Sequence, residues 1–356
     1  MFRIFTIKNF RCFQDLTLTP LERVNLITGM NNVGKTALLE ALFLHIGPNN
    51  PDLPVRIDVI RGIEKASLDA VEIWGWLFFE KHIDQTIELT SLNDDNVKRS
   101  LQIRLLEPGL SRLLSSKNDD IDSQKLVGSI TTAVLPNEIL LEYKDTAGQT
   151  GTSRIFITSE GLKIERAQIK PIPVGIFLSA RLRFPLENIE RFSKLDAVGR
   201  QDEMLTILQL LEPRLRRLAV LVKGGVPMIY GDLGVGELVP LPLMGEGMVR
   251  LLSVLLAIIN ATGGTVLIDE IENGLHHSVM LKVWQAIAET ARRSETQIFA
   301  TTHSWECIRA AHEAFTKNGT YDFRFHRLDR LDDEIKAITY DQEALASAIK
   351  AELEVR

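Results

Sequence analysis

Residues 29–36 read Gly-Met-Asn-Asn-Val-Gly-Lys-Thr, which is a complete G-x-x-x-x-G-K-[ST] phosphate-binding loop. Apolar residues 24–28 precede the loop and predict a short buried strand. The leucine- and alanine-rich residues 35–45 that follow predict a buried helix. Such a loop needs a strand before it and a helix after it, because its backbone N–H groups and the helix N-terminus must point at a phosphate. The motif therefore confines the chain to α/β folds that bind a nucleotide.

The position of each residue in the loop predicts its role with ATP. Lys35 is expected to reach the β- and γ-phosphates and to assist catalysis, and Thr36 is expected to ligate Mg²⁺. The predicted nucleotide-binding residues are Gly29, Asn31, Asn32, Val33, Gly34, Lys35, Thr36 and Ala37. Residues 316–319 do not form the N-K-x-D pattern that recognises guanine, which favours ATP over GTP.

A second apolar strand, residues 265–268, runs directly into two acids, Asp269 and Glu270. A carboxylate at the carboxyl end of a strand beside the phosphate loop stands where Mg²⁺ needs a protein ligand, so Asp269 is predicted to bind the metal together with Thr36. Glu270 is then free to orient or deprotonate an attacking water and is the predicted catalytic base.

A third apolar strand, residues 297–300, is followed by Thr-Thr-His-Ser. A lone histidine at a strand end is more often structural than functional. Next to the phosphate loop and the two acids the functional interpretation is favoured, and His303 is predicted to contact the γ-phosphate. Lys35, Glu270 and His303 are the predicted catalytic residues.

The order of apolar segments predicts the fold class. In the last third of the chain, strands at 265–268 and 297–300 alternate with helices at 247–260, 277–291 and 305–315, which predicts a mainly parallel sheet with helices on both faces. Residues 47–173 instead predict an antiparallel β elaboration, and residues 184–240 predict a helical lobe. A last helix is expected from Gln342, with Asp341 as its N-cap.

Composition excludes several other classes of protein. The 356 residues include two cysteines, which cannot form a disulfide framework or a cysteine zinc site. The longest apolar run, residues 251–259, is about half of the roughly 20 residues that a membrane span needs. A net charge of −6 lacks the basic surplus of many nucleic-acid-binding proteins. We expect a cytoplasmic protein without membrane contact.

The motifs together resemble the ABC-type ATPase heads of the SMC/RecF/OLD group, and among them the stand-alone OLD-like ATP-binding proteins of bacteria and archaea. Residues 4–13 resemble that group's first hairpin, Asn31 fits its G-x-N-x-x-G-K-T loop, and residues 38–41 resemble its following helix. The resemblance covers residues 1–46 and 174–356. It implies an ABC/SMC-type P-loop ATPase head, split in sequence by an inserted β-rich elaboration at 47–173.

In such heads a signature segment from a second subunit completes the nucleotide site, so the resemblance implies a homodimer with ATP between the heads. The candidate segment is residues 243–248, where backbone N–H groups of Gly245 and Gly247 would contact the γ-phosphate. Gly245 stands where the usual pattern has serine. Residues 272–276 occupy the place of the dimer-facing D-loop. Arg181 is either a site-edge residue that meets phosphate or the partner, or an exposed basic residue.

Three functions stay open at this point. The favoured one is an ATP-hydrolysing dimeric switch that controls a separate effector, such as a nuclease or toxin in phage defence, since the stretch after the Thr-His-Ser segment is too short for an appended nuclease domain. A RecF-like protein that binds DNA in repair or maintenance is the first alternative. An ATP-dependent scaffold with little turnover is the second.

Overall fold

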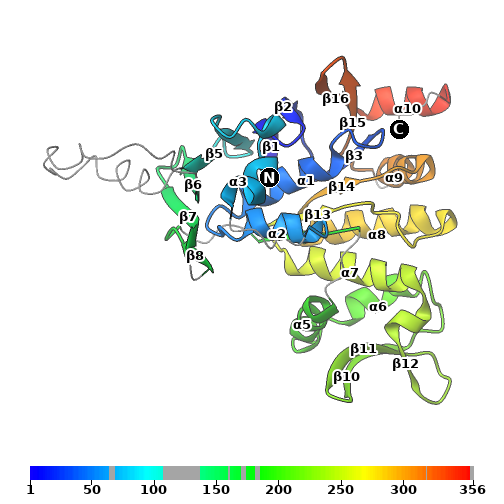
Figure 1. Ribbon diagram of the computed structural model, residues 1–356. Coiled ribbons are helices and arrows are strands. Elements are labelled where there is room, and N and C mark those ends of the chain that lie inside the picture. The colour runs from blue at the N-terminus through cyan, green and yellow to red at the C-terminus, as the bar shows by residue number, and fades with distance from the viewer. Residues whose placement is uncertain are drawn as a thin grey trace, which may run out of the picture.

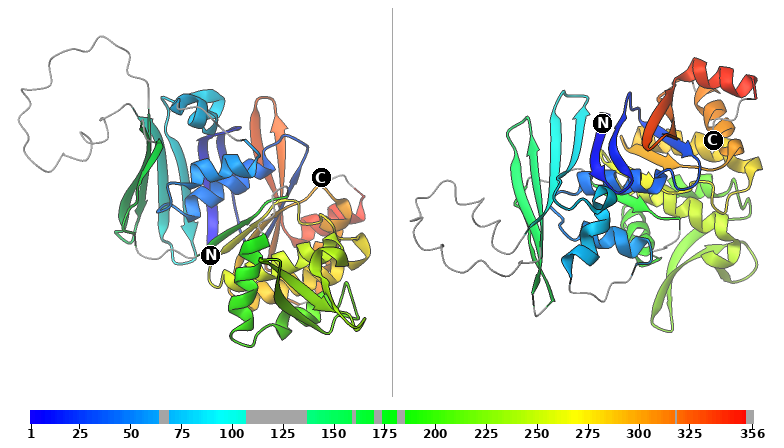
Figure 2. Two further views of the ribbon diagram at one scale, coloured as in Figure 1. Left: turned by 60° about the horizontal axis from the view of Figure 1, so that its bottom comes forward. Right: turned by 45° about the horizontal axis from the view of Figure 1, so that its top comes forward.

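The computed structural model describes residues 1–63, 69–106, 137–158, 161–169, 174–180, 185–317 and 319–352. Two large sheets lie side by side with helix α1 (Lys35–Ile46) between them (Figures 1 and 2). More helices cover the far face of the sheet that contains β3, β13 and β14, and a smaller lobe lies beyond them. The predicted α/β class is confirmed.

In the described part of the chain, the sheet that carries the phosphate loop has the strand order β16-β15-β3-β14-β13-β9, in which only β16 is antiparallel to its neighbour. Its strands are β3 (Val24–Gly29), β9 (Gly175–Leu178), β13 (Thr265–Ile268), β14 (Gln297–Thr301), β15 (Phe323–Leu331) and β16 (Glu334–Tyr340). The central strands are buried on both faces and are therefore continuously apolar, which explains why the sequence revealed them.

Alternate residues of these strands face two separate cores. On β13, Leu267 packs toward α1, whereas Val266 and Ile268 pack toward the helices of the other face. Those helices are α7 (Glu246–Asn260), α8 (Met280–Arg293), α9 (Trp305–Lys317) and α10 (Gln342–Lys350). The N-cap prediction for α10 is confirmed, because a carboxylate oxygen of Asp341 accepts a hydrogen bond from Ala344 N at 2.8 Å.

The second sheet is wholly antiparallel, with the order β2-β1-β4-β5-β6-β7-β8. Its strands are β1 (Phe2–Phe10), β2 (Phe13–Leu18), β4 (Ile87–Asn93), β5 (Lys98–Leu106), β6 (Glu138–Asp145), β7 (Thr150–Thr158) and β8 (Gly161–Glu165). The predicted elaboration therefore continues directly from the N-terminal hairpin, since β1 pairs with β4. The division of the chain at 46 and 173 stays a prediction.

Short helices and the lobe fill in the rest of the described chain. Helices α2 (Leu53–Ile60) and α3 (Ala70–Trp74) follow α1. The lobe contains α5 (Pro185–Asp196), α6 (Asp202–Leu208), β10 (Arg217–Lys223), β11 (Val226–Asp232) and β12 (Leu238–Pro240). The lobe expected to be helical is thus half β, because β10 to β12 form a three-stranded antiparallel sheet. Of the helices described, none has the length and apolar character needed to cross a membrane.

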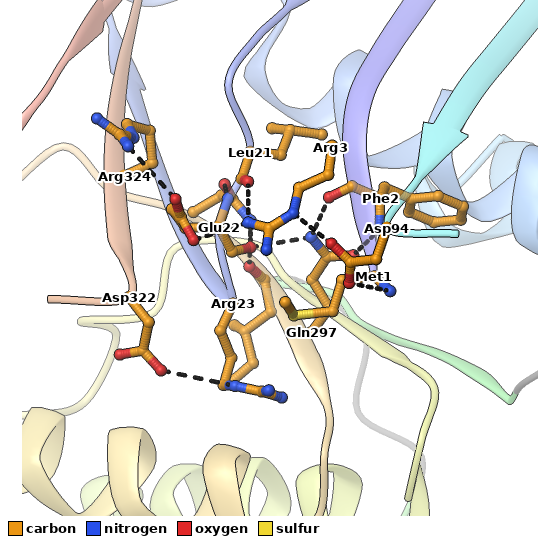
Figure 3. A network of polar contacts seen from close by, with 12 residues as sticks. Met1, Phe2, Arg3, Leu21, Glu22, Arg23, Asp94, Gln297, Asp322 and Arg324 are labelled. Atoms are coloured by element: carbon orange, nitrogen blue, oxygen red, sulfur yellow. Dashed lines mark hydrogen bonds and ion pairs between the residues drawn. The ribbon is translucent and has the colours of Figure 1, made fainter. Parts of the chain in front are cut away.

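A polar network holds the two sheets together at the edge where the parallel strands begin (Figure 3). The amide of Gln297, the first residue of β14, accepts a hydrogen bond from Phe2 N at 2.8 Å and donates to Phe2 O at 2.9 Å. It also donates to Glu22 O, just before β3, at 2.9 Å. One buried side chain therefore fixes β1 against the start of β3 and β14, and the site lies at the opposite ends of those strands.

Candidate nucleotide site

Three neighbouring strands end at the same edge of the parallel sheet, and each ends in polar residues. β3 runs into the phosphate loop, β13 into Asp269 and Glu270, and β14 ends at Thr301. β14 lies between the other two, so its terminal threonine stands between the loop and the acids. The structure thus brings together at one edge the three motifs that the sequence predicted separately.

The phosphate loop is shaped by backbone that only glycine adopts readily. Gly34 has φ of 98°, and a Cβ at this position would lie 2.6 Å from Cys12 Sγ and 2.7 Å from the Phe13 ring. The N-terminal hairpin therefore forms one wall of the loop. Gly34 gives α1 no side-chain cap, and the first turn of α1 holds no acidic residue, which leaves the positive helix end for an anion.

The Lys35 side chain is folded over the loop. Its Nζ donates hydrogen bonds to Gly29 O at 2.6 Å and to Met30 O at 2.9 Å, and the residue is buried. Burial lowers the pKa of Lys35, and the carboxylates of Asp269, Glu270 and Glu272 oppose that shift. A cation in a loop with an uncapped helix end fits the phosphates of a nucleotide.

Asp269 joins the loop to the ends of β13 and β14. Its carboxylate oxygens lie 3.2 and 3.3 Å from Thr36 Oγ1, and Oδ1 accepts a hydrogen bond from Thr301 Oγ1 at 2.8 Å. Burial raises the pKa of the Asp269 carboxyl, and the hydrogen bonds from Thr301 and Thr36 oppose that rise. A hydroxyl and a carboxylate so close together are the hard oxygen donors that Mg²⁺ prefers, so Thr36 and Asp269 would hold the metal of a bound nucleotide.

Glu270 is held at its backbone and at both carboxylate oxygens. Its φ of 50° is unusual for a residue other than glycine, and its N–H donates to Thr301 Oγ1 at 2.8 Å. Oε2 accepts from Asn273 Nδ2 at 2.8 Å, and Oε1 lies 3.2 Å from His303 Nε2. The Glu270 side chain is 36% exposed, so its carboxylate is fixed in direction and open to water.

The structure places His303 beside the acid and not alone at a strand end. Its backbone N–H donates to Glu272 Oε1 at 2.7 Å, which holds the segment after β14 against the loop after β13. Sequence reasoning gave Thr301 no role and placed Asn273 in the predicted D-loop, without predicting its contact with Glu270. Thr301 bonds both Asp269 and Glu270, and only the pairing of β13 with β14 makes that visible.

The predicted signature segment lies at the N-terminus of α7. Gly245 has φ of 106° and no atom within 4 Å of a Cβ placed there, whereas a Cβ on Gly247 would lie 2.5 Å from Gly274 O. Gly247 is therefore packed within its own chain, against the segment predicted to be the D-loop. Leu243, the first residue of the segment, is 76% exposed. Arg181 lies outside the described residues.

A phosphate loop, a strand-end Asp-Glu pair and a histidine at the next strand, on a mainly parallel sheet, define an ABC-type P-loop ATPase. Within that class the chain belongs to the family described as "AAA domain, putative AbiEii toxin, Type IV TA system", which matches residues 24–308. The chain is 24% identical over 325 residues to an "ATP/GTP phosphatase" of Helicobacter pylori, with 86% of each protein covered.

One solved structure shares this fold. The chain is similar to an Smc head bound to the C-winged helix domain of ScpA, with a TM-score of 0.51 and 12% identity over 98% of this chain and 99% of that one. It is also similar to an Smc head with an extended coiled coil derived from Pyrococcus furiosus, with a TM-score of 0.47 and 10% identity over 98% of each chain. The first likeness shows the head fold expected from the sequence.

Proposed function

We propose that the chain is an ATP-driven switch: two copies close on ATP and Mg²⁺, hydrolyse the nucleotide and thereby control a separate effector protein. The observation that carries the proposal is the continuous set of contacts from Thr36 through Asp269 and Thr301 to Glu270. It joins nucleotide-binding, metal-binding and base functions in one rigid unit, which a protein that only bound a nucleotide would not need.

The chain's own residues divide the work. Lys35 and the uncapped end of α1 would bind phosphate oxygens, and Thr36 and Asp269 would hold the metal, which neutralises phosphate charge when bound. Glu270 would orient a water and accept its proton at a carboxylate oxygen. Asn273 and His303 hold that carboxylate in one direction, which favours attack along one line.

A second copy would complete the site from the open side. Met30 in the phosphate loop is 77% exposed and Leu243 before α7 is 76% exposed, and large apolar side chains exposed beside polar motifs mark interaction surfaces. The backbone around Gly245 has free space above it for a phosphate of the facing subunit. Two such half-sites placed head to tail would each enclose one nucleotide.

A separate effector is supported by the position of the chemistry. The predicted nucleotide-binding residues lie on β3, the phosphate loop, α1 and the start of α7, and the β1–β2 hairpin walls the loop. Strands β4 to β8 and the lobe of α5 to β12 therefore remain for partner recognition. The family's description names a putative toxin of a toxin–antitoxin system, which is consistent with an ATPase that works with a separate effector protein. A change in nucleotide state would move these surfaces as the two heads close.

Steady-state turnover of the purified chain tests the proposal. Mg²⁺-dependent ATP hydrolysis is expected, and Glu270→Gln should lower kcat by about 10²–10⁴ while ATP binding survives, because the amide keeps a hydrogen-bonding group and loses the base. Glu313→Gln, on the surface of α9, is the matched control and should not change turnover. Wild-type turnover by Glu270→Gln would refute the assignment of Glu270 as the catalytic base. Turnover measured in parallel with GTP would show whether the site prefers adenine or guanine nucleotides.

The biological role needs a second experiment. The Glu270→Gln variant should retain ATP and capture the effector in pull-downs from the native host, and substitutions on β8 or on the β10–β11 hairpin should release it. Stimulation of turnover by duplex DNA would favour the RecF-like alternative. ATP binding without turnover or partner would favour the scaffold.

A further inference from the structure

Arg250 on α7 has a set of contacts that the proposed chemistry does not account for. Its side chain is buried, and its guanidinium donates hydrogen bonds to backbone carbonyls at the ends of two strands. Nη1 donates to Ser179 O, just after β9, at 3.2 Å. Nη2 donates to Glu270 O at 3.1 Å and also to Asp269 O, both just after β13.

We propose that Arg250 is a positioning residue that fixes the backbone of the catalytic base, Glu270, to α7, the helix that begins in the signature segment. The inference rests on the proposed function, since it assigns a role relative to the proposed base. Arg250 does not contact the reacting atoms; it acts on the base through the Glu270 carbonyl that it binds.

The backbone of Glu270 is the place where such a bond matters most. A positive φ at a residue with a side chain costs about 1–3 kcal/mol and persists only where the surroundings impose it. Here Thr301 Oγ1 binds the N–H of Glu270 and Arg250 binds its carbonyl, so both sides of the strained residue are fixed. Without the second bond the backbone could relax and turn the carboxylate away.

A second contact joins the same two elements. A Cβ on Gly247 would touch Gly274 O, so the first turn of α7 lies directly against the loop that follows Glu270. That loop also contains Asn273, whose amide binds the Glu270 carboxylate. A facing subunit that displaced the start of α7 would therefore shift both the backbone carbonyl and the carboxylate of Glu270.

The test is a double-variant cycle on turnover. Arg250→Lys keeps the charge but has a single nitrogen, which cannot span carbonyls on two strands. It should lower kcat about tenfold with the Kd for ATP changed less than twofold. In the Glu270→Gln background, measured by single turnover, the same change should cost less than twofold, because its effect passes through a base that is no longer there.

Arg292→Lys is the matched control, since Arg292 on α8 also binds a carbonyl, Thr320 O at 2.8 Å, together with Asp322, and is not part of the site. It should leave kcat unchanged in both backgrounds. Arg250→Gln provides a second, neutral variant, with thermal unfolding measured for each, and should show the same dependence on Glu270.

Different outcomes would refute the role of Arg250 and the proposed ATPase function. An equal loss of kcat in both backgrounds, or a loss of ATP affinity as large as the loss of kcat, would show that Arg250 only supports the fold and would overturn the inference alone. No turnover by the wild type, or full turnover by Glu270→Gln, would overturn the proposed function and the inference with it.

Discussion

Two helices begin at glycines beside the site, and their N-termini differ in one respect. α1 follows Gly34 and α7 follows Gly245; both glycines have positive φ, and neither helix has a side-chain cap. A Cβ on Gly34 would collide with Cys12 and Phe13 of the N-terminal hairpin, whereas a Cβ on Gly245 would meet nothing within 4 Å. The first helix end is walled by its own chain and the second is open.

The difference explains what a single chain can do. At α1 the fold itself builds the pocket for phosphates, so binding should need one chain only. At α7 the same kind of helix end lies open, as expected if it contacts a nucleotide bound to the phosphate loop of a facing subunit. One chain therefore carries one closed and one open half of a nucleotide site, and substitutions at the two helix ends should have different effects.

The largest expected effect is at the closed end. Gly34→Ala adds a Cβ where Cys12 Sγ lies 2.6 Å away and forces an unfavourable φ, at about 1–3 kcal/mol for the backbone alone. The Kd for ATP should rise about 100-fold or more, measured by calorimetry. Gly245→Ala imposes similar backbone strain in open space and should change that Kd less than threefold. Equal losses at both positions would remove the distinction between the two ends.

Leu243→Glu tests the open end without touching the packing of the chain. Arginine at Gly247 would not be a clean probe, because Gly247 packs against Gly274, whereas Leu243 is exposed. A carboxylate forced into an apolar interface costs several kcal/mol, so turnover should fall about 100-fold with ATP affinity unchanged.

The matched control is Leu186→Glu on α5, where the leucine is 66% exposed. It should leave turnover unchanged. Light scattering of the Glu270→Gln protein with ATP should show a dimer that Leu243→Glu abolishes. A Leu243→Glu chain that hydrolyses ATP as a monomer at the wild-type rate would show that α7 needs no facing subunit.

Low pH should destabilise the fold around α1 through His45, which lies in the last turn of that helix. Burial lowers the pKa of His45 to about 3, and the same holds for His326 on β15. The unfolded chain binds these protons below about pH 6.5, so stability is present above that pH and is lost as pH falls toward 3. Each histidine should lower the free energy of unfolding by about 2 kcal/mol at pH 5, relative to pH 7.

Urea unfolding of wild type and His45→Gln at pH 7 and pH 5 measures this loss. The variant should lose about 2 kcal/mol less between the two pH values, because glutamine keeps a polar group near Ser91 Oγ without a titrating one. The same loss in both proteins would mean that His45 does not contribute to acid sensitivity.

The smallest effect is expected between the two helix ends, at His303. Its ring holds one oxygen of Glu270, and a side-chain hydrogen bond of this kind is worth about 1 kcal/mol. His303→Asn should therefore lower kcat about fivefold with little change in KM. His82→Asn, at an exposed histidine after α3, is the control. A loss as large as that of Glu270→Gln would instead give His303 a direct role with the phosphate.

Local sequence was sufficient for the parts of the site that are contiguous. Residues 29–36 predicted a loop between β3 and α1, and apolar runs ending in Asp269 and His303 predicted strand ends, because buried strands leave a hydrophobic signature. The helical lobe was only half right, since the β10–β11 hairpin carries few strongly alternating positions. Arg250 could not be assigned, because its partners lie on other elements. Asn273 is close to Glu270 in sequence, but no pattern showed that the loop folds back to bring its amide onto the carboxylate.

The sequence by itself determined that this chain binds and hydrolyses a nucleotide on a parallel α/β head, because each motif is a short string whose chemistry depends on near neighbours. Only the tertiary structure decided that Thr301 joins Asp269 to Glu270, that Arg250 ties both to α7, and that the N-terminal hairpin walls the loop at Gly34. The physical reason is that hydrogen bonds and steric contacts depend on separation in space. Strand order and helix packing set that separation, and no local pattern encodes it.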